Sequence, residues 1–266
     1  MKSAVVLREK LSARQPVLGV LVTHHLWLEL IEIAIGSGLD YAILDAEHLD
    51  HGGSLMADVC RLGRMADFPI LVRPADTNPT ALRLAMDLGP CGLLLPMIDS
   101  AEQLDAARQS LHLPPRGQRR PGGPGNRWLD QYTYDAFRRT VEDTLVVIPQ
   151  IESPQGLENV TAIAAHPLTT AVGVGPFDLS ARLGVCGQMR HPTLWASIER
   201  VRKAADAVGK PMWMIGDGPT LIDQGFRFVC LAEPSAFLEA SLKRLVASLR
   251  SVETPVSNVD SGHENR

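Results

Sequence analysis

Polar residues stand at or just after the ends of several short apolar runs in this sequence. His48, Arg73, Glu152 and Asp178 follow or end four such runs. Two carboxylates on adjacent strands can share one hard divalent cation and leave further positions for water and substrate. An arginine can hold a carboxylate or an enolate oxygen with two hydrogen bonds, and a histidine with an ordinary pKa of about 6.5 can move a proton at neutral pH. Such a set suits proton abstraction or carbon–carbon cleavage beside a carbonyl group.

A metal is expected because this chemistry places negative charge on the oxygen of an enolate. Breaking a bond next to a ketone leaves an enolate, and a divalent cation on the ketone oxygen stabilises that negative charge. No predicted strand ends in a lysine, so a Schiff-base mechanism is not favoured. The same strand-end positions also hold Asp45, Glu47, Gln150 and Asp217.

The glycine-containing segment VGVGPFD, residues 172–178, does not match a nucleotide-binding loop. It lacks a following Lys-Ser/Thr pair, and Asp178 stands where G-x-G-x-x-G requires its last glycine. No nucleotide cofactor is therefore expected. Gly175 and Pro176 instead favour a helix start at which the backbone amides of Phe177 and Asp178 can approach a substrate carboxylate.

The elements that must position these residues alternate between strand and helix. Most of the apolar runs are followed by a segment with helical spacing of apolar residues, and Asn78-Pro79 and Ser153-Pro154 are typical helix starts. Runs that are apolar throughout are expected where both faces of a parallel sheet are covered. Eight such units predict an α/β protein with a single-domain (β/α)8 TIM barrel, and a doubly wound open sheet is the alternative. The predicted strands are residues 17–22, 41–45, 69–74, 91–97, 145–152, 170–176, 211–216 and 226–232.

Two segments depart from this alternation. Residues 112–130 are rich in Arg, Pro and Gly and predict a long irregular loop between the fourth and fifth strands. Residues 251–266 are polar and without period, so we expect a disordered C-terminal tail after a barrel domain of residues 1–250.

Composition narrows the class of protein. The chain has 266 residues, 45% of them apolar, and a formal charge of −4, which gives no general attraction to nucleic acid or to an anionic membrane surface. Its four cysteines are dispersed, and no N-terminal stretch has the apolar core of a signal peptide. A reduced, cytoplasmic protein with a small-molecule substrate is expected.

Five segments, taken in order, resemble the motifs of the HpcH/HpaI aldolase family. The similarity extends over roughly residues 15–250. This family comprises metal-dependent class II pyruvate aldolases with a (β/α)8 barrel and is grouped with the citrate lyase β-subunit. The segments are DAEH (45–48), VRP (72–74), MDLGPCGLLLPM (86–97), PQIES (149–153) and GPFDLS (175–180).

The resemblance implies three catalytic residues. His48 would be the proton acceptor, and Arg73 would stabilise the enolate and bind the pyruvyl group. Asp87 matches an acid that raises the basicity of the histidine. The sequence puts Asp87 near the end of a helix at the far face of a barrel. Either this helix ends early, or the link to His48 is indirect, or the contact crosses a subunit boundary.

The resemblance also implies the binding residues. Glu152 and Asp178 would be the ligands of a divalent cation, Mg²⁺ or Mn²⁺, with Co²⁺ as a further option. Gln150 would contact the substrate, and the amides of Phe177 and Asp178 would hold its carboxylate. The implied partners are a 2-oxo acid of the pyruvate type and an aldehyde, and the implied assembly is a homo-oligomer such as a hexamer. The apolar stripe of Leu238, Leu242, Leu245, Val246 and Leu249 could close its own barrel or pack on a neighbour.

Two departures from the family pattern keep alternatives open. Phe177 stands where many members have a small residue, and Arg120 replaces a glycine in the long loop. The stretch 148–165 is similar to macrophomate synthase, a relative that uses oxaloacetate as its source of enolate. The hypotheses are therefore an aldolase that cleaves or forms 4-hydroxy-2-oxo acids, an oxaloacetate decarboxylase or related carbon–carbon bond former, and a non-enzymatic barrel.

Overall fold

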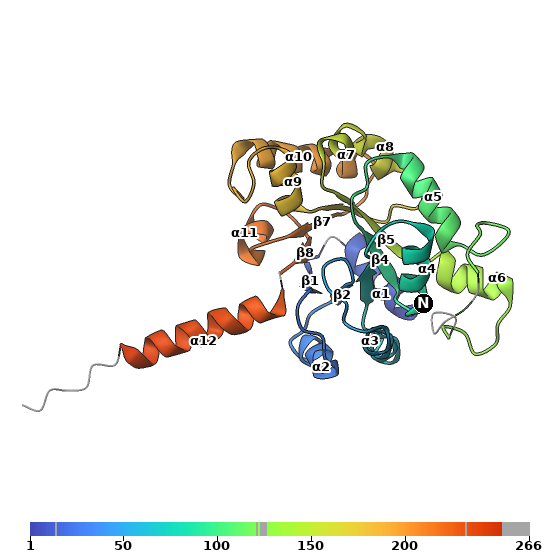
Figure 1. The fold of residues 1–266 in the computed structure, drawn as a ribbon, viewed down its shortest axis with the longest axis horizontal. Helices are drawn as coiled ribbons and strands as arrows, with labels where there is room; N and C mark the ends of the chain where they lie inside the picture. Colours follow the sequence, from blue (N-terminus) through green and yellow to red (C-terminus); the bar gives the residue numbers. More distant parts are fainter. Residues whose placement is uncertain (14, 121, 123–126, 232, 252–266) are drawn as a thin grey trace, which may run out of the picture. The chain divides into compact units, whose positions relative to one another are not determined.

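The computed structural model describes residues 1–266 except 14, 121, 123–126, 232 and 252–266. The chain divides into two compact units, Met1–Glu233 and Pro234–Arg266. In the first unit, eight parallel strands pair in sequence order and close into a barrel, which confirms the predicted fold and excludes the open sheet (Figure 1). The strands are β1 (Val17–Val22), β2 (Tyr41–Asp45), β3 (Ile70–Arg73), β4 (Gly92–Leu95), β5 (Val146–Ile151), β6 (Val172–Val174), β7 (Met212–Ile215) and β8 (Phe228–Cys230).

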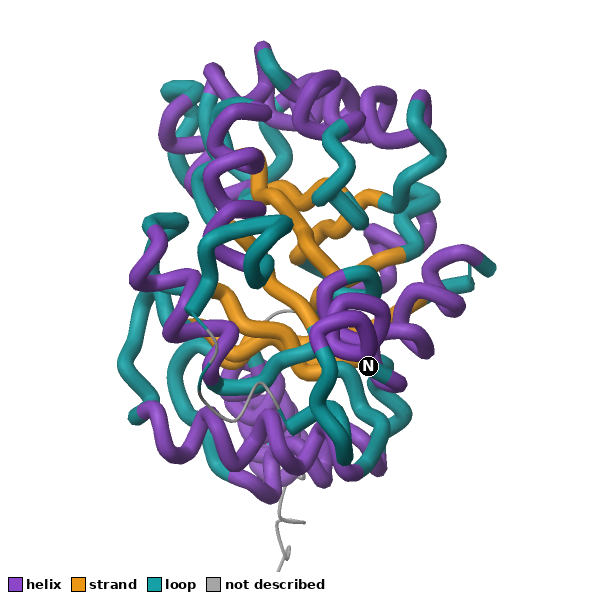
Figure 2. Tube along the Cα trace, turned by 90° about the vertical axis from the view of Figure 1, so that its right-hand side faces the viewer, coloured by secondary structure: helices purple, strands orange, loops and turns teal. Residues whose placement is uncertain are grey.

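Helices of the first unit surround these strands (Figure 2). They are α1 (Lys2–Ser12), α2 (Leu28–Gly36), α3 (Gly53–Met65), α4 (Pro79–Asp87), α5 (Ala101–Leu111), α6 (Tyr134–Phe137) with the π-helical turn η2 (Arg138–Glu142), α7 (Pro154–Glu158), α8 (Val160–Ala165), α9 (Pro176–Arg182), α10 (Pro192–Ala207) and α11 (Gly218–Asp223). The strands are buried almost throughout because side chains fill the barrel on one face and helices cover the other.

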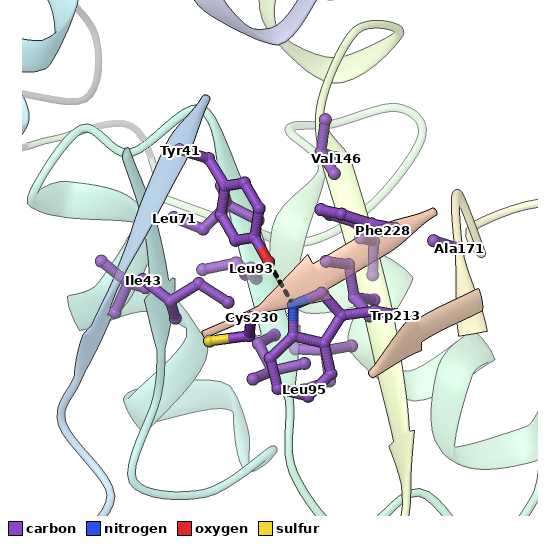
Figure 3. Packing of buried hydrophobic residues seen from close by; sticks show 14 of the residues in the cluster. Tyr41, Ile43, Leu71, Leu93, Leu95, Val146, Ala171, Trp213, Phe228 and Cys230 are labelled. Atoms are coloured by element: carbon purple, nitrogen blue, oxygen red, sulfur yellow. Dashed lines mark hydrogen bonds between the residues drawn. The ribbon is translucent and has the colours of Figure 1, made fainter. Parts of the chain in front are cut away.

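Large side chains fill the interior of the barrel (Figure 3). The Trp213 indole N–H donates to the Tyr41 hydroxyl at 2.9 Å, so both buried polar groups are satisfied. Phe228 packs edge-on against Tyr41 with 5.0 Å between ring centroids. A Cβ at Gly19 would lie 2.5 Å from the Tyr41 ring, so only glycine at this position leaves room for the tyrosine.

The predicted helix signals are present with one difference. Asn78 accepts from the amides of Thr80 and Ala81, and the Ser153 hydroxyl accepts from the Gly156 amide. The helix predicted after Ser153 is instead two helices, α7 and α8. They are separated at Asn159, whose side-chain amide donates to the Asp99 carbonyl at 2.7 Å.

The second unit contains α12 (Pro234–Arg250), none of whose residues is buried. The expected disordered tail lies outside the described residues apart from Ser251. No helix that the structure describes is long and apolar enough to cross a membrane. Cys60, Cys91 and Cys230 are buried, and Cys186 is exposed.

Candidate active site

Adjacent strands bring a carboxylate and a guanidinium group together at the carboxyl end of the barrel. Asp45 ends β2 and is paired in register with Arg73, which ends β3. The Arg73 Nε donates to Asp45 Oδ1 at 2.9 Å, and its Nη2 donates to Asp45 Oδ2. Both side chains are buried, and burial alone would raise the pKa of Asp45. The hydrogen bonds and charge of Arg73 outweigh burial and hold that pKa below its usual value, so Asp45 stays ionised.

His48 completes this network from the loop after β2. Its Nδ1 lies 3.1 Å from Asp45 Oδ2 and 2.9 Å from Arg73 Nη2. A neutral imidazole carries one ring proton, so Nδ1 either donates to Asp45 or accepts from Arg73. When Nδ1 donates to Asp45, Nε2 is left with a free lone pair. The ring is about half exposed, with 53% of its side-chain surface accessible, so a substrate can reach it.

A second carboxylate, Glu47, lies beside Nη1 of Arg73, whereas Asp45 binds Nε and Nη2. Its Oε2 is 3.1 Å from Arg73 Nη1 and 3.9 Å from His48 Nδ1. Burial raises the pKa of Glu47, while the positive charge of Arg73 acts in the opposite direction. Arg73 thus contacts three side chains that come from the last residue of β2 and the segment directly after it.

Glu152 directly follows β5 and is buried, with 2% of its surface exposed. Its Oε2 accepts from the Met97 amide at 2.8 Å, and Met97 adopts a positive φ of 53°. Burial raises the pKa of Glu152 to about 7, and the charges of Glu47 and Asp178 add to this effect. Glu152 is therefore a buried carboxylate among other carboxylates, a setting that a bound cation would stabilise.

Gly175 has no side chain, and this absence makes room for the Glu152 carboxylate. A Cβ at Gly175 would lie 2.1 Å from Glu152 Oε1 and 2.7 Å from Gln150 Nε2. Gln150, in β5, is 2% exposed, and its buried Oε1 has no hydrogen-bond partner among the described residues. The Gly175 backbone thus forms one wall of a polar site that contains Glu152 and an unpartnered amide oxygen.

Phe177 and Asp178 lie in the first turn of α9, after Gly175 at its N-cap. Both are exposed, and 60% of the Phe177 surface is accessible. The charge of Asp178 acts on both Glu152 and Glu47, which places the three carboxylates in one electrostatic environment.

Asp87 lies apart from the network of Asp45, His48 and Arg73. It ends α4, and its Oδ1 accepts from Arg119 Nη2 at 2.9 Å. Arg119 comes from the long loop after α5, and its side chain is fully buried. The carboxylate in contact with His48 is Asp45 instead, a residue that the strand-end pattern includes but that the family resemblance does not single out.

Two groups of side chains could hold a metal ion. Ligand atoms of Asp45, Glu47 and His48 lie within 4.8 Å of one another. The Arg73 guanidinium already contacts all three, so a cation there would face a fixed positive charge. Glu152 and Asp178 have no ion-pair partner within 4 Å among the described residues, and oxygen donors of this kind suit a hard divalent cation.

Comparison with known proteins gives the context of this geometry. A family model described as HpcH/HpaI aldolase/citrate lyase matches residues 28–215. The 2-dehydro-3,6-dideoxy-6-sulfogluconate aldolase of Pseudomonas putida is 29% identical over 224 residues, which cover 82% of this chain and 87% of that protein. The hydroxypyruvate/pyruvate aldolase of Chromohalobacter salexigens is 29% identical over 222 residues, or 81% and 87% of the two chains.

Solved structures share the fold. An HpcH/HpaI aldolase from Desulfitobacterium hafniense superposes with a TM-score of 0.85 and 25% identity, covering 93% of this chain and 97% of that one. Macrophomate synthase superposes with a TM-score of 0.74, covering 93% of this chain and 91% of that one. The two sequences are 23% identical, so this comparison shows only that the fold is shared.

Proposed function

Since this chain belongs to the HpcH/HpaI aldolase/citrate lyase family, we propose that it is a class II aldolase that cleaves and forms 4-hydroxy-2-oxo acids. The donor would be pyruvate or hydroxypyruvate, and the acceptor would be an aldehyde. The observation that carries the proposal is the contact of His48 with Asp45 and Arg73, at the same end of the barrel as the buried Glu152. The aldolase names of two relatives support the same reaction class.

His48 would act as the base. In the cleavage direction, its Nε2 takes the proton from the C4 hydroxyl and the C3–C4 bond breaks. The aldehyde leaves, the electron pair passes into the enolate of the 2-oxo acid, and a proton returned to C3 completes the product. Asp45 supports this role because its carboxylate favours the tautomer with the proton on Nδ1. We therefore assign Asp45 the positioning role that the family resemblance gives to Asp87.

Arg73 would stabilise the enolate with the donor that it has left. Its guanidinium has five N–H groups. Nε and one N–H of Nη2 are directed to Asp45, and Nη1 forms an ion pair with Glu47 Oε2 at 3.1 Å. In the tautomer with the proton on His48 Nδ1, Nη2 lies beside that ring without donating to it, and an N–H on Nη1 can donate to the oxygen on which negative charge develops.

Glu152 and Asp178 would hold a divalent cation, Mg²⁺, Mn²⁺ or Co²⁺, which when bound would polarise the 2-oxo group. The fit rests on the buried, mutually repelling carboxylates and on the Gly175 wall that makes room for Glu152. Gln150 would contact the substrate, with its unpartnered Oε1 accepting from a hydroxyl group, and the backbone amides of Phe177 and Asp178 would orient the substrate carboxylate.

Cleavage of a short 4-hydroxy-2-oxo acid tests the proposal, with pyruvate release coupled to lactate dehydrogenase and NADH. We expect turnover with Mg²⁺ or Mn²⁺, loss of turnover with a chelator, and loss in the Glu152→Gln variant. Glu158→Gln is the matched control because Glu158 is exposed on α7, six residues further along the chain. Folded protein without turnover on any aldehyde-derived substrate would contradict the proposal, as would a fully active Glu152→Gln variant.

Oxaloacetate decarboxylation is the second candidate. The observations that favour it are the similarity of residues 148–165 to macrophomate synthase and the bulky Phe177, which would alter the space around the substrate. Loss of CO₂ from oxaloacetate leaves the same enolate, so the same residues would serve. Pyruvate release from oxaloacetate above the metal-ion background, without aldol cleavage, would replace the first proposal with this one.

We further propose a homo-oligomeric assembly. Its support is the apolar stripe of α12, which contains Leu238, Leu242 and Leu249 at helical spacing. Apolar stripes of this kind are commonly covered by another subunit. Light scattering of the full chain gives its mass in solution, and a monomer would contradict the assembly.

A further inference from the structure

A cavity of the first unit lies away from the residues described above. It has a volume of about 540 Å³ and opens where strands begin, at the opposite end of the barrel from the candidate active site. Its walls include Arg8 of α1, Thr170 before β6, Lys210 before β7 and Arg227 before β8. Pockets that bind small molecules have volumes of about 300–1,000 Å³, so a metabolite would fit.

The charge of this cavity is opposite to that of the whole chain. Arg8, Arg202, Lys210 and Arg227 line it, and Asp206 is the one carboxylate among its lining residues. The chain as a whole carries a formal charge of −4. This concentration of positive charge therefore comes from placement at one end of the barrel and not from composition.

Most of these cations are held by neutral backbone carbonyls. Lys210 Nζ donates to the carbonyls of Ala164 and His166 at 2.6 and 2.8 Å. Arg227 Nη1 donates to the carbonyls of Ile222 and Phe226 at 2.9 and 3.0 Å. Such bonds fix the side chains at the ends of neighbouring helices but leave their charges without a compensating carboxylate.

Arg8 is held in the same way from α1. Its Nε and Nη2 donate to the carbonyls of Thr144 and Leu145 at 3.0 and 2.7 Å, and Nη2 also reaches the Thr170 hydroxyl. Burial lowers the pKa of Arg8 and that of Lys210, as expected for cations without a counter-charge. Within the described part of the chain, neither Arg8, Lys210 nor Arg227 forms an ion pair with a carboxylate.

Donors remain available to a ligand. The contacts above use Nε and Nη2 of Arg8 and leave Nη1, and they leave Nε and Nη2 of Arg227. Arg202 pairs with Glu199 at 2.6 Å, and its guanidinium lies 5.7 Å from the centre of the Phe226 ring, which holds it in place. Arginine groups fixed in this way bind phosphate or carboxylate with paired hydrogen bonds.

We propose that this cavity is a second ligand site, distinct from the candidate active site, for a small anion with at least two negative charges. A phosphate ester and a polycarboxylate share this chemistry. The anion would lie between α1 and the segments that lead into β6, β7 and β8, and it would supply the counter-charge that Arg8, Lys210 and Arg227 lack.

Calorimetric titration of the full chain with pyrophosphate, citrate and acetate, at low ionic strength and with chelator present, tests the proposal. We expect pyrophosphate or citrate to bind, and to bind more tightly than acetate. Arg227→Gln should weaken binding roughly five- to tenfold, and Asp206→Asn should strengthen it roughly threefold because it removes the one lining carboxylate. The second variant leaves every carbonyl contact of the cations intact, so it reports on binding even if the first variant is less stable.

Two controls separate this site from other sources of anion binding. Arg61→Gln removes an exposed charge that pairs with Asp58 on α3, and it should leave the affinity unchanged. Arg73→Gln removes the cation of the candidate active site and should also leave this binding in place. The proposal is overturned if the wild-type chain binds neither polyanion below about 5 mM. It is equally overturned if binding is lost in Arg73→Gln while Arg227→Gln and Asp206→Asn bind as the wild type does.

Discussion

Replacing Gly175 with alanine tests whether the space beside Glu152 matters for activity. The added Cβ would lie 2.1 Å from Glu152 Oε1, whereas ordinary contacts begin at about 3.4 Å, so the carboxylate must move by about 1.3 Å. A displacement of about 1 Å in a catalytic group typically costs a factor of about 10² in rate, or about 2.7 kcal/mol. We therefore expect Gly175→Ala to lower kcat/KM for aldol cleavage about 100-fold and to weaken Mn²⁺ binding.

The effect on stability should be smaller, which separates the two roles of this glycine. The atoms that a Cβ would meet are mainly the ends of the Glu152 and Gln150 side chains, which can move. We expect urea unfolding to show a loss near the lower end of the range of about 1–3 kcal/mol for an overpacked site. Gly36→Ala is the matched control because a Cβ there meets nothing within 4 Å. A Gly175→Ala variant with wild-type kcat/KM and wild-type Mn²⁺ affinity would refute the reasoning.

Further predictions follow from the same contacts. Asp45→Asn should lower kcat by about 10²–10⁴ with little change in KM, because His48 loses the partner that favours its active tautomer; steady-state kinetics that differ less than threefold from wild type would exclude this role. In metal-free protein the pKa of Glu152 is raised from 4.5 to about 7, so its contribution to stability is full below pH 4.5 and declines as the pH rises to about 7. Urea unfolding should show this as a loss of about 3 kcal/mol that is absent in Glu152→Gln, and an equal slope in both proteins would contradict it. Gly19→Ala should destabilise the barrel by about 1–3 kcal/mol because its Cβ meets the Tyr41 ring at 2.5 Å, and an unchanged thermal midpoint would count against this packing.

The barrel itself could be predicted because its strands are continuous apolar runs. All eight predicted runs contain the observed strands, with ends shifted by at most a few residues. The break at Asn159 could not be read in this way. It coincides with a hydrogen bond from the Asn159 side chain to the carbonyl of Asp99, a residue 60 positions earlier in the chain.

The sequence predicts which residues lie near the candidate site but not which of them contact one another. The sequence predicts that Asp45 and Arg73 each stand at the end of a strand. Their contact could not be predicted, because it follows from the register between β2 and β3. The partner of Asp87 could not be predicted either. Asp87 pairs with Arg119, which lies in an irregular loop whose position no sequence pattern indicates.

Two features of the site leave little trace in a single sequence. Gly175 could be interpreted as a residue that lets backbone amides approach a ligand, but its closeness to Glu152 depends on the positions of β5 and β6 in the closed barrel. Met97 has no unusual sequence signal, although its amide holds Glu152 and its φ is positive. Both are effects of tertiary structure on ordinary residues.

Exchange of the pyruvate methyl protons with solvent deuterium tests the central claim most directly, because it reports enolate formation before any aldehyde is known. Proton NMR of pyruvate in D₂O would follow the methyl signal with the wild-type chain and Mg²⁺ or Mn²⁺, with added chelator, and with Glu152→Gln and Glu158→Gln. We predict exchange that requires both the metal and Glu152 and that survives the change at Glu158. Folded wild-type protein that shows no metal-dependent exchange would contradict the account.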